Sequence, residues 1–364
     1  MKALWNAEKQ KRILFLCNNY AQVEVAYLIA NSSQLNFIIY SNIDPVSTLE
    51  KLKRFKKKAD IKFVFNFNSI LFTFPNVSCV ITFVGHISPV LRSEFTNVLK
   101  LAIKTKTPIV EVPHGLFQYG FGFSDDSSII ESASTDYGFG LPYDSIVPNK
   151  VSFLGEDGVG NPRSLMGQLR KIPLTECVLP RYAVISTNTN WYMYDEHDQL
   201  VFFDLIFQFA NLNSDLIFIW CPHPSEVSSP ANSAFNTMMK MRPPNIFLYG
   251  LDRDIYFYQF ETTEELISSS LFGISSVSSV LADYQFFSKP CYVFNNGRFD
   301  DIFSLFSSVT LFKNIDDLST QQSVPPKNLL LKSFDSRKFD AIISNITDLS
   351  QSSSEDISSY VEFL

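Results

Sequence analysis

Three short motifs at wide spacing bring together residue types that could carry out group transfer. They are the acidic turn Glu156-Asp157-Gly158, the dipeptide His223-Pro224 and the hydroxyl cluster of residues 275–279. Each motif is predicted to follow a β-strand. A carboxylate can deprotonate an acceptor hydroxyl, and an imidazole and serine hydroxyls can hydrogen-bond a phosphate. Glycosyl transfer from a nucleotide sugar needs this combination.

The acidic turn places two carboxylates beside two glycines, Gly158 and Gly160. Glycine adopts positive φ readily and lets the backbone bring the acids close to a ligand. Glu156 and Asp157 are both candidates for the base, and the second acid could tune or orient the first. The alternative is an exposed acidic turn without a chemical role.

His223 stands between Pro222 and Pro224, which restrict its backbone, and it follows the strongly apolar segment 216–220. Its imidazole could donate to a phosphate oxygen or to a leaving group. The alternative is a structural turn. Because the chain has only 4 histidines and this one lies at a predicted strand end, we favour a functional role.

The serine cluster lies between a predicted strand and a predicted helix. Hydroxyls and free N–H groups at a helix N-terminus can bind an anion, although an ordinary serine N-cap has the same pattern. The expected donor-binding residues of this cluster are Ser275, Ser276, Ser278 and Ser279.

Two other polar segments also follow predicted strands. Asn188 and Asn190 are expected to contact the nucleotide. His114 and Gly115, with Tyr119 in the aromatic run beside them, are expected to bind the acceptor. The alternative for this aromatic run is a hinge in the core.

Composition limits the classes of function. A length of 364 residues predicts two domains, and 46% hydrophobic residues, including 35 Phe, can fill a core in each. The net charge of −7 argues against general nucleic-acid binding. The 5 cysteines stand singly without metal-site or redox spacing, so we expect neither a metal site nor a disulfide framework.

Short apolar strands alternate with helical segments, which predicts parallel sheets covered by helices on both faces. The expected strands are 12–17, 36–40, 62–65, 79–83, 108–112, 151–154, 182–186, 216–220, 245–249, 271–274, 291–294 and 309–312. The expected helices are 21–30, 93–105, 199–210, 263–269, 278–286 and 336–349. Residues 120–150 are rich in Gly, Ser, Asp and Tyr and predict a long functional loop.

The segment 172–181 contains Pro173 and Pro180 and is the expected linker. The predicted domains are an acceptor-side domain over 1–172 that carries the acidic motif, a nucleotide-sugar-binding domain over 181–335, and a helix and tail over 336–364. Two Rossmann-like α/β domains facing across a cleft form the GT-B arrangement, in which ligands bind beyond the carboxyl ends of strands.

The order and spacing of the motifs resemble those of bacterial sialyltransferases of GT-B type. The lipooligosaccharide sialyltransferases and capsular polysialyltransferases share an acidic D/E-D/E-G motif, an HP motif and a later Ser/Thr motif. This chain has Glu156-Asp157-Gly158, His223-Pro224 and the serines of 275–279 in that order. The context Leu154-Gly-Glu-Asp-Gly-Val-Gly160 is also similar. The resemblance spans most of the chain.

The resemblance implies CMP-sialic acid as donor and transfer with inversion to a surface glycan, with no metal or other cofactor. One carboxylate of Glu156 or Asp157 would be the base. His223 would support the departing CMP phosphate, and the serines of 275–279 would hydrogen-bond that phosphate.

Other functions stay open. Asn161-Pro162 stands where several sialyltransferases have an aromatic residue. Pro113-His114-Gly115 resembles an element of teichoic-acid glycerophosphotransferases, which use CDP-glycerol and also carry HP and SS-type elements. A CMP-Kdo transferase would have the same leaving group. The non-enzymatic alternative is a degenerate GT-B module that binds a glycan or nucleotide without turnover.

The N-terminus has no apolar segment of signal-peptide length, and no run of about 18 apolar residues occurs in the chain. We therefore expect a cytoplasmic protein whose partners are a nucleotide sugar and a glycan, not nucleic acid. The basic run Lys51-Leu-Lys-Arg-Phe-Lys-Lys-Lys58 could contact the inner face of an anionic membrane. Its alternative is a solvated helix face.

Overall fold

A computed structural model divides the chain into two compact units. The first contains residues 1–173 and 331–364, and the second contains residues 174–330. The structure describes residues 11–53, 55, 61–83, 93–112, 122–123, 129–130, 149–151, 153, 158–165, 181–187, 196–223, 226–227, 233–252, 260, 262–276, 278, 280–295, 309–320 and 332–352. Residues 331–335, which the sequence analysis placed in the second domain, group with the first unit.

The first unit contains a parallel sheet in the order β3-β2-β1-β4-β5-β8. Its strands are β1 Arg12–Cys17, β2 Phe37–Ser41, β3 Lys62–Val64, β4 Val77–Thr82, β5 Ile109–Glu111 and β8 Asn149–Lys150. Its helices are α1 Tyr20–Ser32, α2 Pro45–Leu52, α3 Phe67–Thr73, α4 Ser93–Lys104 and α12 Ser336–Ser352. A short antiparallel pair joins β6 Gly122–Phe123 to β7 Ile129–Ile130.

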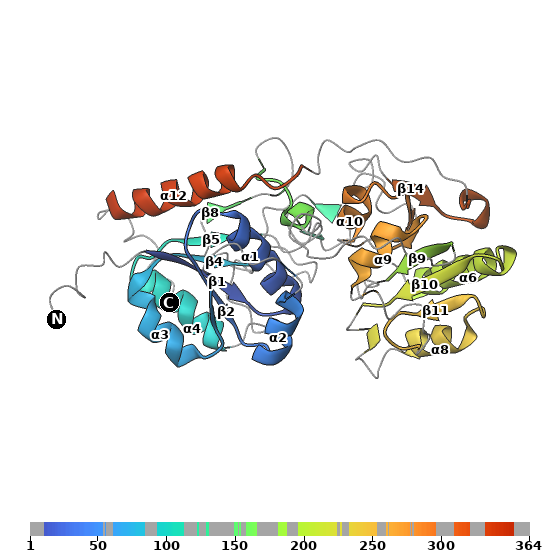
Figure 1. Cartoon of the computed structure of the whole chain (residues 1–364), viewed down its shortest axis with the longest axis horizontal. Coiled ribbons are helices and arrows are strands. Elements are labelled where there is room, and N and C mark those ends of the chain that lie inside the picture. Colours follow the sequence, from blue (N-terminus) through green and yellow to red (C-terminus); the bar gives the residue numbers. More distant parts are fainter. Residues whose placement is uncertain are drawn as a thin grey trace. The chain divides into compact units, whose positions relative to one another are not determined.

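Alternate residues of the central strands enter two cores, one on each face of this sheet. Phe15 and Ile39 pack in the core that includes α1 and α12, whereas Leu16 and Tyr40 pack in the core that includes α3 and α4. The strands are therefore apolar on both faces, as a parallel sheet between helices requires. Figure 1 shows α12 and α1 on one side of these strands and α3 and α4 on the other.

The second unit contains a parallel sheet in the order β11-β10-β9-β12-β13-β14. Its strands are β9 Tyr182–Ser186, β10 Ile217–Cys221, β11 Ile246–Leu248, β12 Gly273–Ser275, β13 Cys291–Phe294 and β14 Val309–Phe312. Its helices are α6 Glu196–Leu212, α8 Ser233–Met241, α9 Thr263–Ser269 and α10 Leu281–Phe286. Counted in chain order, both sheets run 3-2-1-4-5-6, the Rossmann order.

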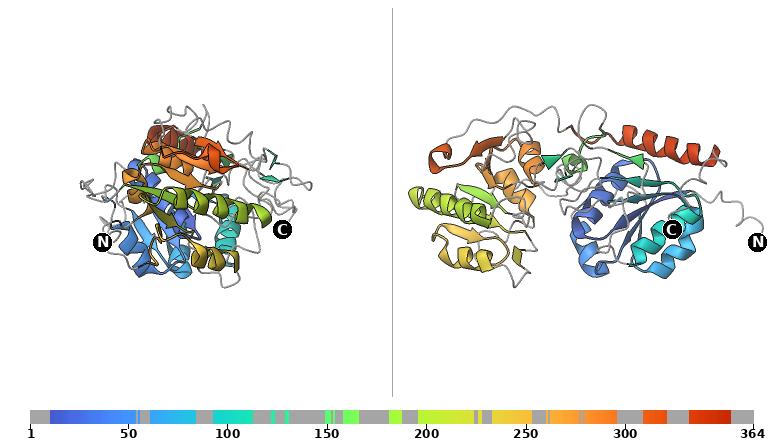
Figure 2. Two further views of the ribbon diagram at one scale, coloured as in Figure 1. Left: turned by 90° about the vertical axis from the view of Figure 1, so that its right-hand side faces the viewer. Right: turned by 180° about the vertical axis from the view of Figure 1, so that it is seen from behind.

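Aromatic rings join α6 to the second sheet. The ring centroids of Phe203 and Trp220 lie 4.9 Å apart, and those of Phe202 and Phe294 lie 5.7 Å apart. Figure 2 shows the yellow-green α6 running alongside the strands of this sheet. Trp220 is fully buried, so its indole N–H must find a partner inside the protein.

Most predicted elements occur within a few residues of their expected places, with three informative differences. The strand expected over 151–154 lies earlier, because Asn149–Lys150 pairs with β5. The helix expected from residue 278 begins at Leu281. Three helices, α2, α3 and α8, were not predicted. Within the described segments, no helix has the length and apolar character needed to cross a membrane.

The chain returns to the first unit beside the segment that follows the acidic motif. The N–H of Asn161 donates to the carbonyl of Lys332 at 3.0 Å, and the N–H of Asp335 donates to the carbonyl of Val159 at 2.7 Å. Residues 332–335 thus hold residues 159–161 by backbone hydrogen bonds on both sides of the bridge between Asn161 and Ser333.

Gly160 is the point of closest approach between these two segments. Its φ of +80° lies in the left-handed region, and an added Cβ would collide with the backbone carbonyl of Ser333. Of the two glycines that the sequence analysis placed in the acidic turn, Gly160 adopts a positive φ. Glycine at position 160 is therefore required both by its positive φ and by packing against the returning chain.

We predict that Gly160→Ala destabilises the first unit through both strain and collision. Gly250→Ala is the matched control, because Gly250 has the same φ of +80° and no atom within 4 Å of an added Cβ. The control should cost about 1–2 kcal/mol from φ alone, and Gly160→Ala should cost about 1–3 kcal/mol more from overpacking. Amide hydrogen exchange in each unit measures both values. Equal losses of stability in the two variants would show that the backbone at Ser333 shifts to accommodate the added Cβ without destabilising the protein.

Candidate active site

The carboxyl ends of three adjacent strands meet in the second unit at the place where the strand order reverses. β9 pairs with β10 on one side and with β12 on the other. The chain continues into Thr187 after β9, into Pro222-His223 after β10 and into Ser276 after β12. In open α/β sheets this switch point is where ligands bind.

A buried carboxylate joins the ends of β9 and β10. Glu226 is 1% exposed, and its Oε2 accepts hydrogen bonds from Thr187 Oγ1 at 2.6 Å and from the backbone N–H of His223 at 2.8 Å. Thr187 Oγ1 in turn accepts from Trp220 Nε1 at 2.9 Å. This network satisfies the buried indole and connects the interior of the sheet to the His223 turn.

A second set of hydroxyl contacts joins the ends of β9 and β12. Ser275 Oγ lies 3.1 Å from the carbonyl oxygen of Ser186 and 2.8 Å from that of Ser276. Ser186 Oγ lies 3.0 Å from the hydroxyl of Tyr284 on α10. A Cβ at Gly273 would collide with the Tyr284 ring, so glycine is what lets this tyrosine lie across β12.

The serines of the predicted donor site differ in their environments. Ser275 and Ser276 are fully buried, and the Ser275 hydroxyl is engaged by backbone carbonyls. Ser278 is partly exposed, and its Oγ accepts from the N–H of Val280 at a long 3.4 Å. Val280 is the N-cap of α10 and makes no side-chain cap, so none of these serines is the N-cap residue. Ser278 is the described hydroxyl of the cluster that reaches solvent.

His223 reaches solvent at the end of β10. The surrounding protein atoms desolvate the imidazolium and lower the pKa of His223 from the usual histidine value. The ring is therefore neutral at pH 7 and offers one N–H donor. The neighbouring thiol of Cys221 is buried, which raises its pKa to about 12 and removes it as a nucleophile at neutral pH.

Several predicted site residues lie outside the described residues. These are Glu156, Asp157, Pro224, Ser279, Asn188, Asn190, His114, Gly115 and Tyr119. The structure places His223, Ser275, Ser276 and Ser278 at or just beyond the carboxyl ends of β10 and β12 in one sheet. The roles assigned to all of these residues stay predictions. In the described segments, no group of three or more His, Cys, Asp and Glu side chains is placed to hold a metal ion.

Sequence reasoning missed two residues of this edge, Thr187 and Glu226. Thr187 follows β9 directly and precedes Asn188, which was chosen in its place. Glu226 stands three positions after His223, and the N–H of Glu226 donates to the carbonyl of His223 at 2.8 Å. That spacing lets the carboxylate reach back to the N–H of the residue three positions earlier, which is one half of a capping box.

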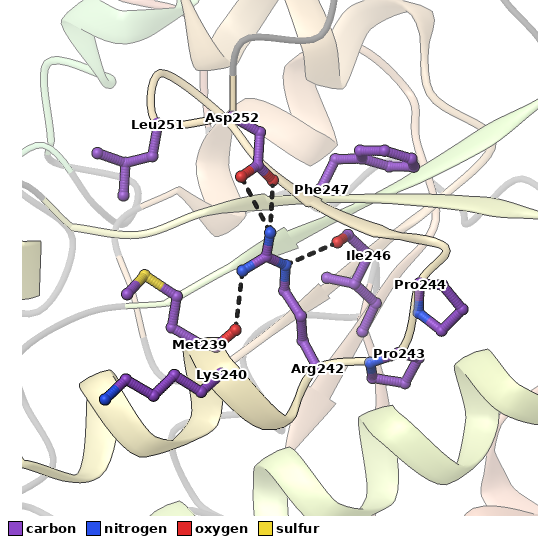
Figure 3. A pocket seen from close by; sticks show the side chains of 9 residues that line it. All are labelled: Met239, Lys240, Arg242, Pro243, Pro244, Ile246, Phe247, Leu251 and Asp252. Carbon is purple, nitrogen blue, oxygen red and sulfur yellow. Dashed lines mark hydrogen bonds and ion pairs between the residues drawn. The ribbon is translucent and has the colours of Figure 1, made fainter.

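A surface pocket of about 770 Å³ lies at the outer edge of β11, away from these strand ends. Arg242 forms an ion pair with Asp252 at 2.9 Å and donates to the carbonyls of Ile246 and Met239 (Figure 3). Asp252 accepts the N–H of Leu248. These side chains hydrogen-bond backbone groups on the outer edge of β11, which protects that edge from pairing with another strand. We assign this pocket a structural role.

No protein-family model matches this chain, and no curated protein matches it in sequence. Solved structures do resemble it. S. aureus MnaA, in a structure with UDP, aligns over 93% of this chain and 97% of its own with 12% identity and a TM-score of 0.60. The UDP-GlcNAc 2-epimerase of Methanocaldococcus jannaschii, in complex with UDP-GlcNAc and UDP, aligns over 93% and 99% with 13% identity and a TM-score of 0.57.

At these identities the likeness shows the fold alone. Together with the two Rossmann-ordered parallel sheets, it establishes a two-domain fold of the GT-B type. The fold class predicted from the sequence is therefore confirmed.

We predict that Ser275→Ala and Ser278→Ala act differently. Ser275→Ala removes the hydroxyl between β9 and β12 and should cost about 0.5–1.5 kcal/mol in the free energy of unfolding. Ser278→Ala changes a partly exposed side chain with one long hydrogen bond and should stay within about 0.5 kcal/mol of wild type. Urea denaturation measures both. A larger loss for Ser278→Ala would contradict this division between a structural and a solvent-facing serine.

Proposed function

We propose that this protein is a glycosyltransferase that moves sialic acid, or a related nonulosonic acid, from a CMP-activated donor to a hydroxyl of a bacterial surface glycan. The observation that supports the proposal is that His223 and Ser278 follow β10 and β12, the two strands that flank β9 at the switch point of the second unit. A phosphate bound at these strand ends could accept hydrogen bonds from the imidazole of His223 and the hydroxyl of Ser278. The motif resemblance supports CMP as the nucleotide.

In the proposed reaction the acceptor hydroxyl oxygen attacks the anomeric carbon of the sialyl donor. The bond from that carbon to the phosphate oxygen of CMP breaks, and CMP leaves with the electron pair. The hydroxyl proton passes to the carboxylate of Glu156 or Asp157, and the configuration inverts. His223 and the serines hydrogen-bond the departing phosphate. No metal or other cofactor takes part in this proposal, since protein donors stabilise the charge.

A second candidate is an enzyme acting on a UDP-sugar, such as a 2-epimerase. It is favoured by the fold likeness to structures that hold UDP or UDP-GlcNAc. The two candidates differ in the nucleotide bound and in the product. A 2-epimerase converts the donor sugar and needs no glycan acceptor, whereas a sialyltransferase releases CMP only as the acceptor gains mass.

The remaining alternatives are separated by their products. A CDP-glycerol phosphotransferase would add phosphorus to the acceptor. A CMP-Kdo transferase would release the same CMP but add a different sugar mass. A degenerate binding module would bind nucleotide or glycan without turnover.

We also propose a cytoplasmic location with peripheral contact at the inner face of the membrane. The basic run of residues 51–58 supports this contact. The run begins in the last turn of α2, on which Val46 is 70% exposed and Leu49 is 43% exposed. Lys51 Nζ lies 3.8 Å from the centre of the Tyr20 ring, and Lys53 pairs with Glu50 on the exposed surface.

Turnover of CMP-sialic acid tests the main proposal. With galactose-terminated or sialylated acceptors, mass spectrometry should show the gain of a sialyl residue together with CMP release. Glu156→Gln and Asp157→Asn are measured separately, and replacement of the base should lower kcat by about 10²–10⁴-fold. Glu50→Gln is the control, because this carboxylate lies on the exposed face of α2, and it should leave kcat unchanged.

Product from a UDP-sugar and none from CMP-sialic acid would overturn the sialyltransferase proposal in favour of the second candidate. Product with full activity in both acid variants would overturn the assignment of the base.

We predict that the protein co-sediments with vesicles containing anionic lipid more strongly than with neutral vesicles. Replacing Lys56, Lys57 and Lys58 by Ser should remove most of this preference, because each basic residue near an anionic surface contributes about 1 kcal/mol. Lys332→Ser is a control that removes a cation outside the run. Equal sedimentation with both kinds of vesicle would show that the basic run is a solvated surface.

A further inference from the structure

We propose that Glu226 is a positioning residue that holds His223 in the orientation in which its imidazole meets the leaving phosphate. This inference rests on the proposed function, because it concerns the same phosphate site. It assigns a role to a carboxylate that neither motif reasoning nor the resemblance identified. Glu226 acts through the backbone of His223 and need not touch the substrate.

The directions of the hydrogen bonds show that Glu226 is the terminal acceptor of the network. An indole Nε1–H can only donate, so Thr187 Oγ1 accepts from Trp220. The single hydroxyl proton of Thr187 is therefore free to point at Glu226 Oε2, 2.6 Å away. A backbone N–H also can only donate, which fixes the direction of the bond from His223. One carboxylate oxygen thus gathers two donors.

Burial makes this arrangement rigid. Glu226 is 1% exposed, Trp220 is 0% exposed and Thr187 is 5% exposed. Hydrogen bonds among such groups are stronger than at the surface, and an unpaired member would be costly. The ring of Trp220 is packed between those of Phe203 and Phe235, with centroids 4.9 and 5.1 Å away. The network is therefore anchored in the aromatic core of the second unit.

The His223 turn is held at both ends by the same residue. The side chain of Glu226 accepts the N–H of His223, and the N–H of Glu226 donates to the carbonyl of His223 at 2.8 Å. The first bond is the side-chain-to-backbone half of a capping box, and the second is the backbone hydrogen bond of a four-residue turn. Pro222 and Pro224 restrict the same backbone from either side. With its backbone fixed, the His223 ring can change direction only by rotation about its own χ1 and χ2.

Glutamine separates positioning from charge. In Glu226→Gln the amide oxygen can accept from both Thr187 and His223, whereas Glu226→Ala leaves both donors without this acceptor. The positioning role therefore predicts rescue by Gln. We expect kcat for Glu226→Gln to stay within a few-fold of wild type, and kcat for Glu226→Ala to fall by about 10²-fold, the size expected for a misplacement near 1 Å.

A double-mutant cycle with His223→Asn is the test. If Glu226 acts through the His223 ring, Glu226→Ala should lower kcat by less than about twofold once that ring is gone, because the effects of coupled residues do not add. Arg242→Ala is the matched control: it removes the ion pair at the far edge of the sheet and should reduce stability while kcat is unchanged. Additive effects on kcat, or equal loss in the control, would overturn the proposal.

Amide hydrogen exchange at His223 provides a readout that needs no substrate. The N–H of His223 should be protected in wild type and in Glu226→Gln and should lose protection in Glu226→Ala. If Glu226→Ala does not fold, Glu226→Gln still decides, because a folded Gln variant without protection or with a 10²-fold loss would contradict positioning. Failure of CMP-sialic acid turnover with intact exchange results would overturn the proposed function and leave the hydrogen-bonding role of Glu226 standing.

Discussion

The pairing of β9 with both β10 and β12 is the constraint on which the candidate site depends. It places three strand ends side by side, although Thr187, His223 and Ser276 lie far apart in the chain. The Glu226 network and the Ser275 contacts then join these ends by hydrogen bonds. A site of this kind needs no single local motif, because topology assembles it and buried polar groups hold it.

In the first unit, backbone hydrogen bonds likewise join two segments that lie far apart in the chain. Glu156 and Asp157 precede a segment that the returning chain grips at Val159 and Asn161. Gly160 permits that grip, since any side chain there would collide with Ser333. Helix α12 begins directly after this returning segment.

The sequence predicts the strands and the fold class better than it predicts the hydrogen bonds around Glu226. Strands such as β1 and β9 are continuous apolar runs, and the alternation of strands and helices predicts the confirmed fold class. Helix α2 was missed although Val46, Leu49 and Leu52 recur every three residues, because a stripe of three residues in an 8-residue segment is too short to stand out as a helical pattern. Glu226 was missed because its partners include Thr187 on another strand end, and such a pairing exists only after the sheet has formed.

The central claim is that the edge around His223 is a cytidine-nucleotide site, and nucleotide binding tests it most directly. A ligand that binds only the folded protein raises Tm by mass action. The account predicts a larger rise in Tm with CMP than with UDP at equal concentration, and loss of the CMP response in His223→Asn. A larger response to UDP, or a CMP response that survives this substitution, would contradict it.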